Sequence, residues 1–436
     1  MDAIKSYSWK NHHLLLQHLE IHKLQHIHFK MVTGDMLPHR KPNKKADDDP
    51  KAWRPIMCLC SFRKIFTKII SNRMYNLIET PSYQMLSPFA FGFRKGLGMQ
   101  DAIFVVKEAL QANINKRLSQ YMIFVDVEQA YDSVEPQKLE EVLKLKLFNQ
   151  GEINVIMNLM THISAITSTQ WGDSELFPLE RGLPQGDSLS PIIFVIFLDS
   201  IITILNRMPL SSLDQDWNTV GFVDDVMCLP STLQEAQTML TLLWKLLSWM
   251  GLVLSLDKTE ILQLRQHQES LLNHPLVCHK QVEGRMEKFL LLPNLPMVKI
   301  VHHADSIRYL GWKLDRHLQS TKTYLDLVED IKAKLADVRL GGRVLDIWYR
   351  VMQTFINSKV NHLSSISWIP LQQAEGITAL VTQKLKTAAG LSKLASPHWL
   401  YVPKQYGGLG IYPVHLWMQA KQLITFIKMM HSTIHW

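Results

Sequence analysis

Cysteine is scarce in this sequence. Only four cysteines occur among 436 residues: Cys58, Cys60, Cys228 and Cys278. So few and so scattered thiols form neither a disulfide framework nor a zinc module. This usage is typical of a reducing, intracellular compartment.

Long apolar runs are also missing. The longest one, Ile192 to Leu205, is short for a membrane span and carries Asp199 in its middle. The first residues, Met1 to Lys5, lack the uninterrupted apolar core of a secretory signal. We therefore expect a buried helix at Ile192 to Leu205 and no membrane partner.

The composition is that of a globular protein, with 47% hydrophobic and 20% charged residues. Its length suggests roughly two to four domains. Lys and Arg (47) outnumber Asp and Glu (39), which gives a net charge of +8. This charge favours a polyanionic partner such as nucleic acid, although many basic proteins bind none.

Two adjacent carboxylates, Asp224 and Asp225, lie inside an otherwise apolar, β-favouring run between Gly221 and Leu229. Buried anions are costly unless a cation compensates their charge. Because successive strand residues point to opposite faces, a tight hairpin turn is the geometry that presents both carboxylates near one place. The pair predicts either a metal site on a hairpin or a β-turn in which the side chains cap the backbone.

A third carboxylate belongs to a separate apolar strand. Tyr121 to Val127 is predicted to be a buried strand with Asp126 near its end, and a helix should start near Pro136. A two-metal nucleotidyl-transfer site needs carboxylates from separate strands, because each ion must keep positions open for the reacting oxygens. Asp126 and the Asp224–Asp225 pair supply such a set, but three aspartates alone leave many alternatives.

A loop rich in glycine and proline, Arg181 to Pro191, lies between these carboxylates. Its two glycines and first proline predict a rigid turn whose backbone another group can approach closely. Taken alone, it is an ordinary loop before a helix that starts at Ser188–Pro191. Its position between Asp126 and the Phe222–Asp225 stretch argues against that interpretation.

Basic segments lie upstream of these carboxylates. Trp53 to Leu59 is strand-like, and in Phe62 to Ile70 apolar positions at helical spacing alternate with cations. The cations of this predicted amphipathic helix are available to a nucleic-acid backbone or to solvent. Leu37 to Lys45 is predicted to be a basic loop, either a solvated linker or a phosphate contact.

The N-terminal segment carries several histidines. His18, His22 and His26 recur every fourth residue, which would align them on one face of a helix. No cysteine or acidic ligand completes a metal set there, so a plain surface face and a metal site both stay open.

Together, these segments resemble the reverse transcriptases of non-LTR retrotransposons. The resemblance extends from about Leu37 to about Trp417, and its blocks follow the order of that family. The blocks are Trp53–Ile56, Phe93–Gly96 with Asp101–Ile103, Asp126–Val134, Arg181–Pro191, Phe222–Asp225, Gly251–Thr259, Tyr309–Trp312, and Tyr401–Lys404 with Gly407–Gly410.

The resemblance implies catalytic roles for residues at matching positions. Asp126, Asp224 and Asp225 would be the metal ligands, with the Val127 carbonyl as a backbone ligand, and the ion would be Mg²⁺ or Mn²⁺. Lys258 matches the lysine proposed to protonate the departing pyrophosphate.

Nucleotide contacts are implied in the same way. Tyr131 matches the bulky residue that excludes a ribose 2′-hydroxyl, with a core tyrosine as the alternative. Gln185 and Gly186 match residues that line the incoming-nucleotide pocket. Arg54 and Lys41 match finger cations that clamp the triphosphate.

Primer and template contacts are implied for Arg94 and for the Tyr309-Leu310-Gly311 hairpin, which would grip the primer end. The chain departs from the family pattern at two positions. Val223 stands where the family more often has Ala, and Ser255 where it often has Asn. Neither departure removes a charged group.

The fold implied is α+β, a right-hand polymerase with fingers, a palm of antiparallel sheet plus helices, and a helical thumb. We expect an N-terminal extension, fingers, a palm with finger–palm insertions, and a thumb with the C-terminal segment, at residues 1–36, 37–120, 121–320 and 321–436. Helical spacing predicts a thumb helix with an apolar face made by Leu325, Val328, Ile331, Leu335 and Val338.

The implied activity is DNA synthesis directed by an RNA template, with a DNA primer and dNTPs as the other partners. Telomerase-like and group II intron maturase-like enzymes share the palm, and a catalytically silent, domesticated RNA-binding scaffold is the alternative of a different class. The implied location is the nucleus, for target-primed synthesis, or the cytoplasm. The sequence shows no zinc-finger or endonuclease module. The chain is therefore expected to be the polymerase part of a longer element protein, a truncated copy or a stand-alone relative, and such modules could be supplied elsewhere.

Overall fold

The computed structural model divides into two compact units. Unit 1 comprises Met1–Gly96, Asp126–Arg207 and Leu242–Ser255, and unit 2 comprises Leu97–Val125, Met208–Thr241 and Leu256–Trp436. The structure describes residues 33–40, 53–80, 85–115, 121–161, 163–169, 172–209, 217–264, 271, 274–301, 305–314, 321–337, 352–366, 369–388 and 390–430. The histidines expected on one helix face lie outside these residues. The division into fingers, palm and thumb stays a prediction.

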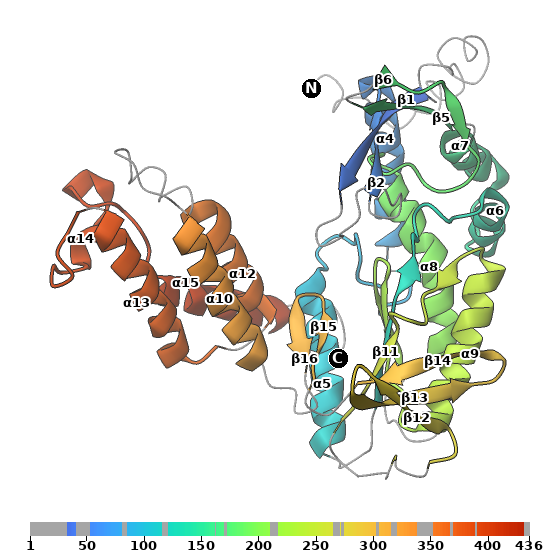
Figure 1. Cartoon of the computed structure of the whole chain (residues 1–436). Coiled ribbons are helices and arrows are strands. Elements are labelled where there is room, and N and C mark those ends of the chain that lie inside the picture. The colour runs from blue at the N-terminus through green and yellow to red at the C-terminus, as the bar shows by residue number, and fades with distance from the viewer. Residues whose placement is uncertain are drawn as a thin grey trace. The chain divides into compact units, whose positions relative to one another are not determined.

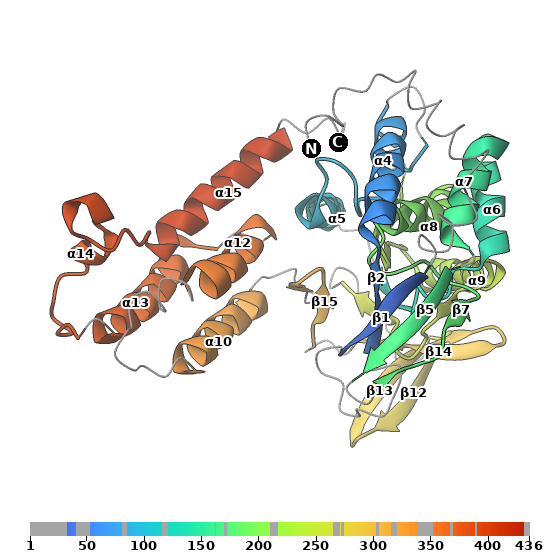
Figure 2. The same cartoon turned by 90° about the horizontal axis from the view of Figure 1, so that it is seen from above.

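Unit 1 contains a small mixed sheet with strand order β2-β1-β5-β6, in which β7 also pairs with β5 (Figure 1 and Figure 2). β1 is antiparallel to β2 and parallel to β5. The strands are β1 (Thr33–Arg40), β2 (Trp53–Leu59), β5 (Ile163–Thr169), β6 (Gly172–Asp173) and β7 (Phe177–Leu179). Met57, Leu59, Ile163 and Ala165 form the small core that this sheet covers.

The helices of unit 1 are α4 (Ser61–Ile78), α6 (Pro136–Leu145), α7 (Gln150–Met160) and α8 (Ser190–Asn206). The short strands β4 (Val127–Glu128) and β10 (Val253–Leu254) form a separate antiparallel pair. Pro136 begins α6 as predicted, since a proline in the first turn removes no helical hydrogen bond. Asn149 and Glu152 close a capping box at the start of α7.

The predicted loop at Leu37 is wrong for its first residues. Leu37 to Arg40 continue β1 and pair with β2, as far as Arg40 opposite Trp53. The hydrogen bonds of this ladder override the local preference of a proline-containing basic stretch. Residues 41–50, which include Lys41, lie outside the described part of the chain.

Helix α8 is the buried helix predicted from the apolar run. Asp199 in its middle is fully buried and forms an ion pair with Lys146. The other carboxylate oxygen of Asp199 accepts a hydrogen bond from the Ser87 backbone nitrogen at 2.8 Å. The buried charge is therefore compensated within the protein. No helix among the described residues is both long enough and apolar enough to cross a membrane.

Unit 2 is built on a seven-stranded sheet with strand order β12-β13-β14-β11-β3-β9-β8 (Figure 1). β11 and β14 are parallel, and the other neighbouring pairs are antiparallel. The strands are β3 (Tyr121–Val125), β8 (Thr219–Phe222), β9 (Asp225–Cys228), β11 (Glu260–Gln263), β12 (Val277–Val282), β13 (Arg285–Leu292) and β14 (Leu295–Ile300).

Helix α5 (Met99–Asn115) precedes β3 in the sequence, and helix α9 (Leu233–Trp249) lies between β9 and β11. The residues of α9 continue from unit 2 into unit 1. A two-stranded sheet, β15 (Ile307–Tyr309) and β16 (Trp312–Leu314), follows β14. The remaining elements are α10 (Thr321–Asp337), the π-helix η3 (Met352–Ile356), α12 (Asn357–Ile366), α13 (Leu371–Ala388), α14 (His398–Tyr401), the 3₁₀ helix η4 (Lys404–Tyr406) and α15 (Val414–Met430).

Helices α10, α12, α13 and α15 pack together (Figure 2). The apolar stripe predicted on α10 is correct for Ile331 and Leu335, which are buried, and wrong for Leu325, which is 54% exposed. Leu327 is buried instead, because it precedes Ile331 by four residues and shares its face. Val338 lies outside the described residues. The helices and sheets together confirm the predicted α+β class.

Candidate active site

The predicted hairpin carrying the carboxylate pair is present. β8 and β9 are antiparallel, and Phe222 pairs with Asp225 across a turn made by Val223 and Asp224. Val223 has φ = 58° and Asp224 is not among the positive-φ residues, which is the pattern of a type II′ turn. Both carboxylates are exposed, so they are accessible to an ion or a substrate.

Asp126 directly follows β3, whose last residue, Val125, pairs with Val226 of β9. β3 and β9 are antiparallel, so β3 ends where β9 begins with Asp225. The Asp126 carbonyl accepts a hydrogen bond from the Ser255 nitrogen at 2.9 Å, which fixes the backbone immediately after β3. The register therefore brings the end of one carboxylate-bearing strand beside the start of the other.

No three His, Cys, Asp or Glu side chains in the described part of the chain are gathered as a metal-binding group. The donors offered by Asp126, Asp224 and Asp225 are carboxylate oxygens, which suit a hard divalent cation such as Mg²⁺. This donor chemistry fits the predicted ion.

The glycine-proline loop rests against strand β2. The Met57 nitrogen donates to the Gln185 carbonyl at 2.6 Å, and Gln185 forms a parallel bridge with Ile56. Gly186 has φ = 120°, and a Cβ atom there would lie 2.5 Å from the Met57 carbonyl oxygen. Glycine is therefore required at this position both by its backbone conformation and by the close approach of β2.

Side chains predicted to line a nucleotide pocket are held by internal contacts. Gln185 Nε2 donates to Asp132 Oδ1 at 2.7 Å. The ring of Tyr131 stacks on Phe194, with centroids 4.1 Å apart and planes inclined by 20°. The Tyr131 carbonyl also accepts a hydrogen bond from the Leu183 nitrogen at 2.8 Å. Tyr131 and Gln185 thus belong to one connected region of unit 1.

A buried ion pair beside this loop was not predicted. Arg63 of α4 was assigned to a cationic surface, but its side chain is fully buried and its Nε donates to Asp187 Oδ2 at 2.7 Å. Thr67 and Ser71, four and eight residues after Arg63, are also buried. This polar stripe at helical spacing is the signal that marks the buried face. Phe62 and Ile65, expected inside, are about half exposed.

The other predicted contact residues lie in different settings. Arg54 is exposed on β2, and Lys258 is exposed in a turn after β10. Arg94 Nε and Nη2 donate to the two carboxylate oxygens of Glu79, each at 3.2 Å, while Nη1 donates to the Ser87 and Ala90 carbonyls. The guanidinium of Arg94 therefore stabilises the segment between α4 and Arg94 by hydrogen bonds. Its contact with primer or template stays a prediction.

The Tyr309-Leu310-Gly311 segment forms the expected hairpin between β15 and β16. Leu310 and Gly311 both have positive φ, 47° and 84°, as in a type I′ turn. The Tyr309 ring lies 5.7 Å from that of Phe124 in the neighbouring sheet. Burial, and then the nearby Asp225 carboxylate, raises the pKa of Tyr309 above its usual range. Its role in gripping a primer stays a prediction.

A family model described as "Reverse transcriptase (RNA-dependent DNA polymerase)" matches residues 40–314, which is more than half of the chain. The chain belongs to the reverse transcriptase family. The predicted resemblance is therefore confirmed, and the matched range contains the carboxylate hairpin, the glycine-proline loop and the β15–β16 hairpin. This family generally uses divalent metal ions.

Two relatives of this reverse transcriptase come from mobile elements. It is 25% identical over 297 residues to the RNA-directed DNA polymerase from mobile element jockey of Drosophila melanogaster, covering 67% of this chain and 30% of the relative. It is 26% identical over 387 residues to the Pol polyprotein of the retrotransposable element R2 of Nasonia vitripennis, covering 85% of this chain and 34% of the relative. The chain thus spans about a third of the length of these two relatives.

Among solved structures, the chain is similar to telomerase from Candida tropicalis in complex with a fragment of telomeric RNA. The TM-score is 0.50 at 12% identity, and the match covers 93% of this chain and 62% of that one. At this identity the likeness shows the fold alone. It agrees with the right-hand polymerase predicted from the sequence.

Proposed function

We propose that this reverse transcriptase adds deoxynucleotides to the 3′-hydroxyl of a DNA primer, copying an RNA template of a non-LTR retrotransposon. The observation that carries the proposal is the register of β3 on β9. Val125, the last residue of β3, pairs with Val226 of β9. Asp126 directly follows Val125, and Asp225 directly precedes Val226. The β8–β9 turn adds Asp224 at the same end of β9.

Asp126, Asp224 and Asp225 would hold Mg²⁺ or Mn²⁺, with the Val127 carbonyl as a further oxygen donor. When bound, the ions would lower the pKa of the primer hydroxyl and neutralise charge on the pyrophosphate leaving group. Lys258, exposed beyond β10, would donate a proton to the departing pyrophosphate. Arg54 and Lys41 would bind the triphosphate.

Tyr131 would select deoxynucleotides. Its ring stacks on Phe194, which favours the ring position that would meet a 2′-hydroxyl. Gln185, anchored on Asp132, and Gly186 would line the nucleotide pocket next to this ring. Arg94 and the Tyr309-Leu310-Gly311 hairpin would contact template and primer. We propose the nucleus as the location, where a cut target could supply the primer.

Two other functions remain alternatives to this proposal. A telomerase-like enzyme would share this fold, since the chain is similar in structure to telomerase from Candida tropicalis. The mobile-element relatives favour a retrotransposon polymerase instead. A silent RNA-binding scaffold would not need the exposed Asp224 and Asp225.

The decisive experiment is primer extension on a primed RNA template with dNTPs, with Mg²⁺ and Mn²⁺ compared. Asp126→Asn and Asp224→Asn should abolish extension and leave template binding largely intact. Asp173→Asn is the matched control, because it removes an exposed carboxylate from β6 in unit 1. Extension at the wild-type rate by either site variant would exclude the assignment, and a wild-type chain without extension would favour the scaffold.

A further inference from the structure

The segment Tyr401 to Gly410 belongs to the family resemblance but has no part in the proposed reaction. In the structure it folds back on itself: the Gly410 nitrogen donates to the Val402 carbonyl at 2.8 Å, and the Ile411 nitrogen donates to the Leu400 carbonyl at 3.0 Å. A Cβ on Gly408 would overlap the Val402 carbonyl oxygen. This tight loop fixes the short helix α14 between α13 and α15.

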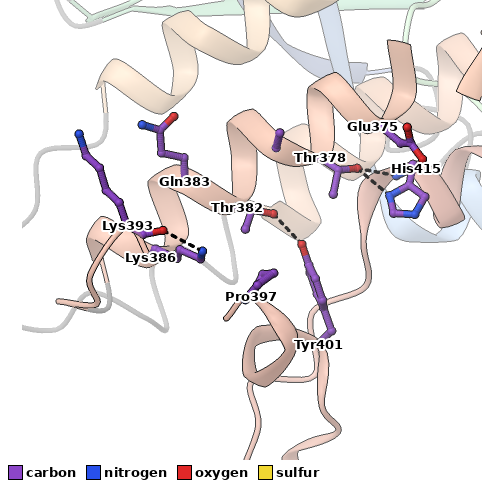
Figure 3. A pocket seen from close by; sticks show the side chains of 10 residues that line it. Glu375, Thr378, Thr382, Gln383, Lys386, Lys393, Pro397, Tyr401 and His415 are labelled. Atoms are coloured by element: carbon purple, nitrogen blue, oxygen red, sulfur yellow. Dashed lines mark hydrogen bonds between the residues drawn. The ribbon is translucent and has the colours of Figure 1, made fainter. Parts of the chain in front are cut away.

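A cavity of about 480 Å³ lies among α13, α14 and α15 (Figure 3). Its size is in the usual range for small-ligand pockets. Most of its lining side chains carry a polar group, while the greater part of the lining surface is apolar. They include Glu375, Thr378, Thr382, Gln383, Lys386, Tyr401 and His415.

The aromatic wall of the cavity is Tyr401. Figure 3 shows its side chain rising from α14 to α13, where its hydroxyl lies 2.6 Å from Thr382 Oγ1. Thr382 is 9% exposed. This hydrogen bond holds the far end of the ring against α13 and leaves the hydroxyl with further hydrogen-bonding capacity. A planar base could pack against such a ring.

At one end of the cavity, Thr378 fixes the imidazole of His415. Thr378 Oγ1 lies 3.1 Å from the Ala374 carbonyl oxygen and accepts a hydrogen bond from the His415 backbone nitrogen at 2.9 Å. His415 Nδ1 also lies 3.1 Å from Thr378 Oγ1, so the imidazole is held at this end of the cavity. Glu375 adds a carboxylate there.

The other end is cationic. Lys386 is half-buried, and its Nζ donates to the Lys393 carbonyl at 3.2 Å, which uses one of its three protons. Lys386 and Glu375 are eleven residues apart on α13, or about 16 Å along the helix. The cavity therefore has a cation, Lys386, at one end and a carboxylate, Glu375, at the other.

We propose that this cavity binds a nucleotide unit of an unpaired nucleic-acid strand, with its phosphate on Lys386 and its base against Tyr401. Glu375 accepts hydrogen bonds from the ribose hydroxyls or from the exocyclic amine of a base, beside His415. The inference rests on the proposed function, because a polymerase must hold template that is not yet paired. It gives the Tyr401–Gly410 segment a role as the support of this site.

The test is binding of a fluorescent single-stranded oligoadenylate to the full chain, followed by anisotropy over a series of salt concentrations. Lys386→Glu should weaken binding about tenfold and lower the salt slope by about 0.7, the value for one phosphate on a single strand. Tyr401→Phe, which keeps the ring, should weaken it severalfold. Lys384→Glu is the matched control, since Lys384 is exposed on the same helix and outside the cavity.

Equal losses for Lys386→Glu and Lys384→Glu, or no loss for either, would overturn the site. Should Lys386→Glu fail to fold, Lys386→Gln gives the same comparison against Lys384→Gln. A parallel series with oligodeoxyadenylate distinguishes RNA from DNA as the bound strand. If Lys386→Glu loses more affinity for RNA than for DNA, the cavity contacts the ribose. If it loses the same affinity for both, the cavity binds either kind of strand. Primer extension on the same preparations tests the proposed function separately, because strand binding is read without catalysis.

Discussion

Arg63 Nε donates to Asp187 Oδ2 across 2.7 Å, and both side chains are completely shielded from solvent. Arg63 Nη2 also donates to the Leu159 carbonyl, and Asp187 Oδ1 accepts from the Leu189 nitrogen at 2.9 Å. The pair therefore connects α4 and the end of α7 to the loop that carries Gln185. The ion pair therefore helps to hold the Arg181–Pro191 loop against β2.

Replacing Arg63 by Met should strongly destabilise the fold. The substitution leaves Asp187 as an unpaired buried anion, for which the expected cost is about 3–5 kcal/mol. The measurement is the free energy of unfolding in urea. Lys64→Met, an exposed cation on the same helix, is the control and should change stability by less than about 0.5 kcal/mol. Similar values for the two variants would contradict the role of the ion pair.

Gly186→Ala should impair both stability and nucleotide incorporation. The added Cβ would lie 2.5 Å from the Met57 carbonyl oxygen, so the loop must move away from β2. A displacement of about 1 Å near reacting groups can lower the rate of incorporation about a hundredfold. Gly172→Ala separates this clash from backbone strain, because Gly172 has a similar φ of 124° but no atom within 4 Å of its Cβ position. Equal effects of both substitutions would show that φ alone matters.

The sequence predicted the elements around the carboxylates well, because each has a strong local signal. The apolar runs at β3 and β9, the two-residue turn and the buried helix α8 each follow from periodicity and turn residues. The family resemblance then supplied their roles. The helix around Asp199 was correctly predicted to be buried, but the ion pair of Asp199 with Lys146 was not predicted, since the two are 53 residues apart in sequence.

Features that depend on distant neighbours could not be predicted. The cations of α4 suggested a solvated face, whereas Asp187, 124 residues away, buries Arg63. Likewise, Leu37 to Arg40 look like a loop until β2 pairs with them. The cavity beside Tyr401 depends on three helices that only tertiary packing brings together. Local propensity contains no information on such partners.

Tyr131→Ala should allow ribonucleotides to be incorporated, because the ring that would meet a 2′-hydroxyl is removed. Tyr131→Phe is the control, since it keeps the ring stacked on Phe194 and should preserve sugar discrimination. The measurement is the ratio of kcat/KM for a dNTP and the matching NTP. Unchanged discrimination in Tyr131→Ala would refute the steric role.

Val223→Gly should stabilise the carboxylate hairpin. Val223 has φ = 58°, a conformation that costs an L-residue about 1–2 kcal/mol and glycine very little. Glycine loses about 0.5–1 kcal/mol more entropy on folding, so the net gain should be about 0.5–1 kcal/mol in the free energy of unfolding. Val282→Gly, in the strand β12 with ordinary φ, should destabilise instead. A loss of stability at Val223 would mean that its side-chain contacts outweigh the strain.

The stability contributed by Lys107 should depend on pH. Burial lowers the pKa of Lys107 from its usual 10.5 to about 8, with Glu108 opposing the shift, and the ammonium lies 4.3 Å from the Trp312 ring centroid. Between pH 8 and 10.5 the unfolded chain binds the proton more tightly than the folded one, so stability should rise with pH over this range. Below pH 8 Lys107 is protonated in both the folded and the unfolded state, and the folded state carries the cost of the buried charge.

Lys107→Met should remove this rise in the free energy of unfolding between pH 8 and 10.5, whereas Lys95→Met, at an exposed lysine, should retain it. Urea unfolding at several pH values measures the difference, and parallel curves for wild type and Lys107→Met would contradict the prediction.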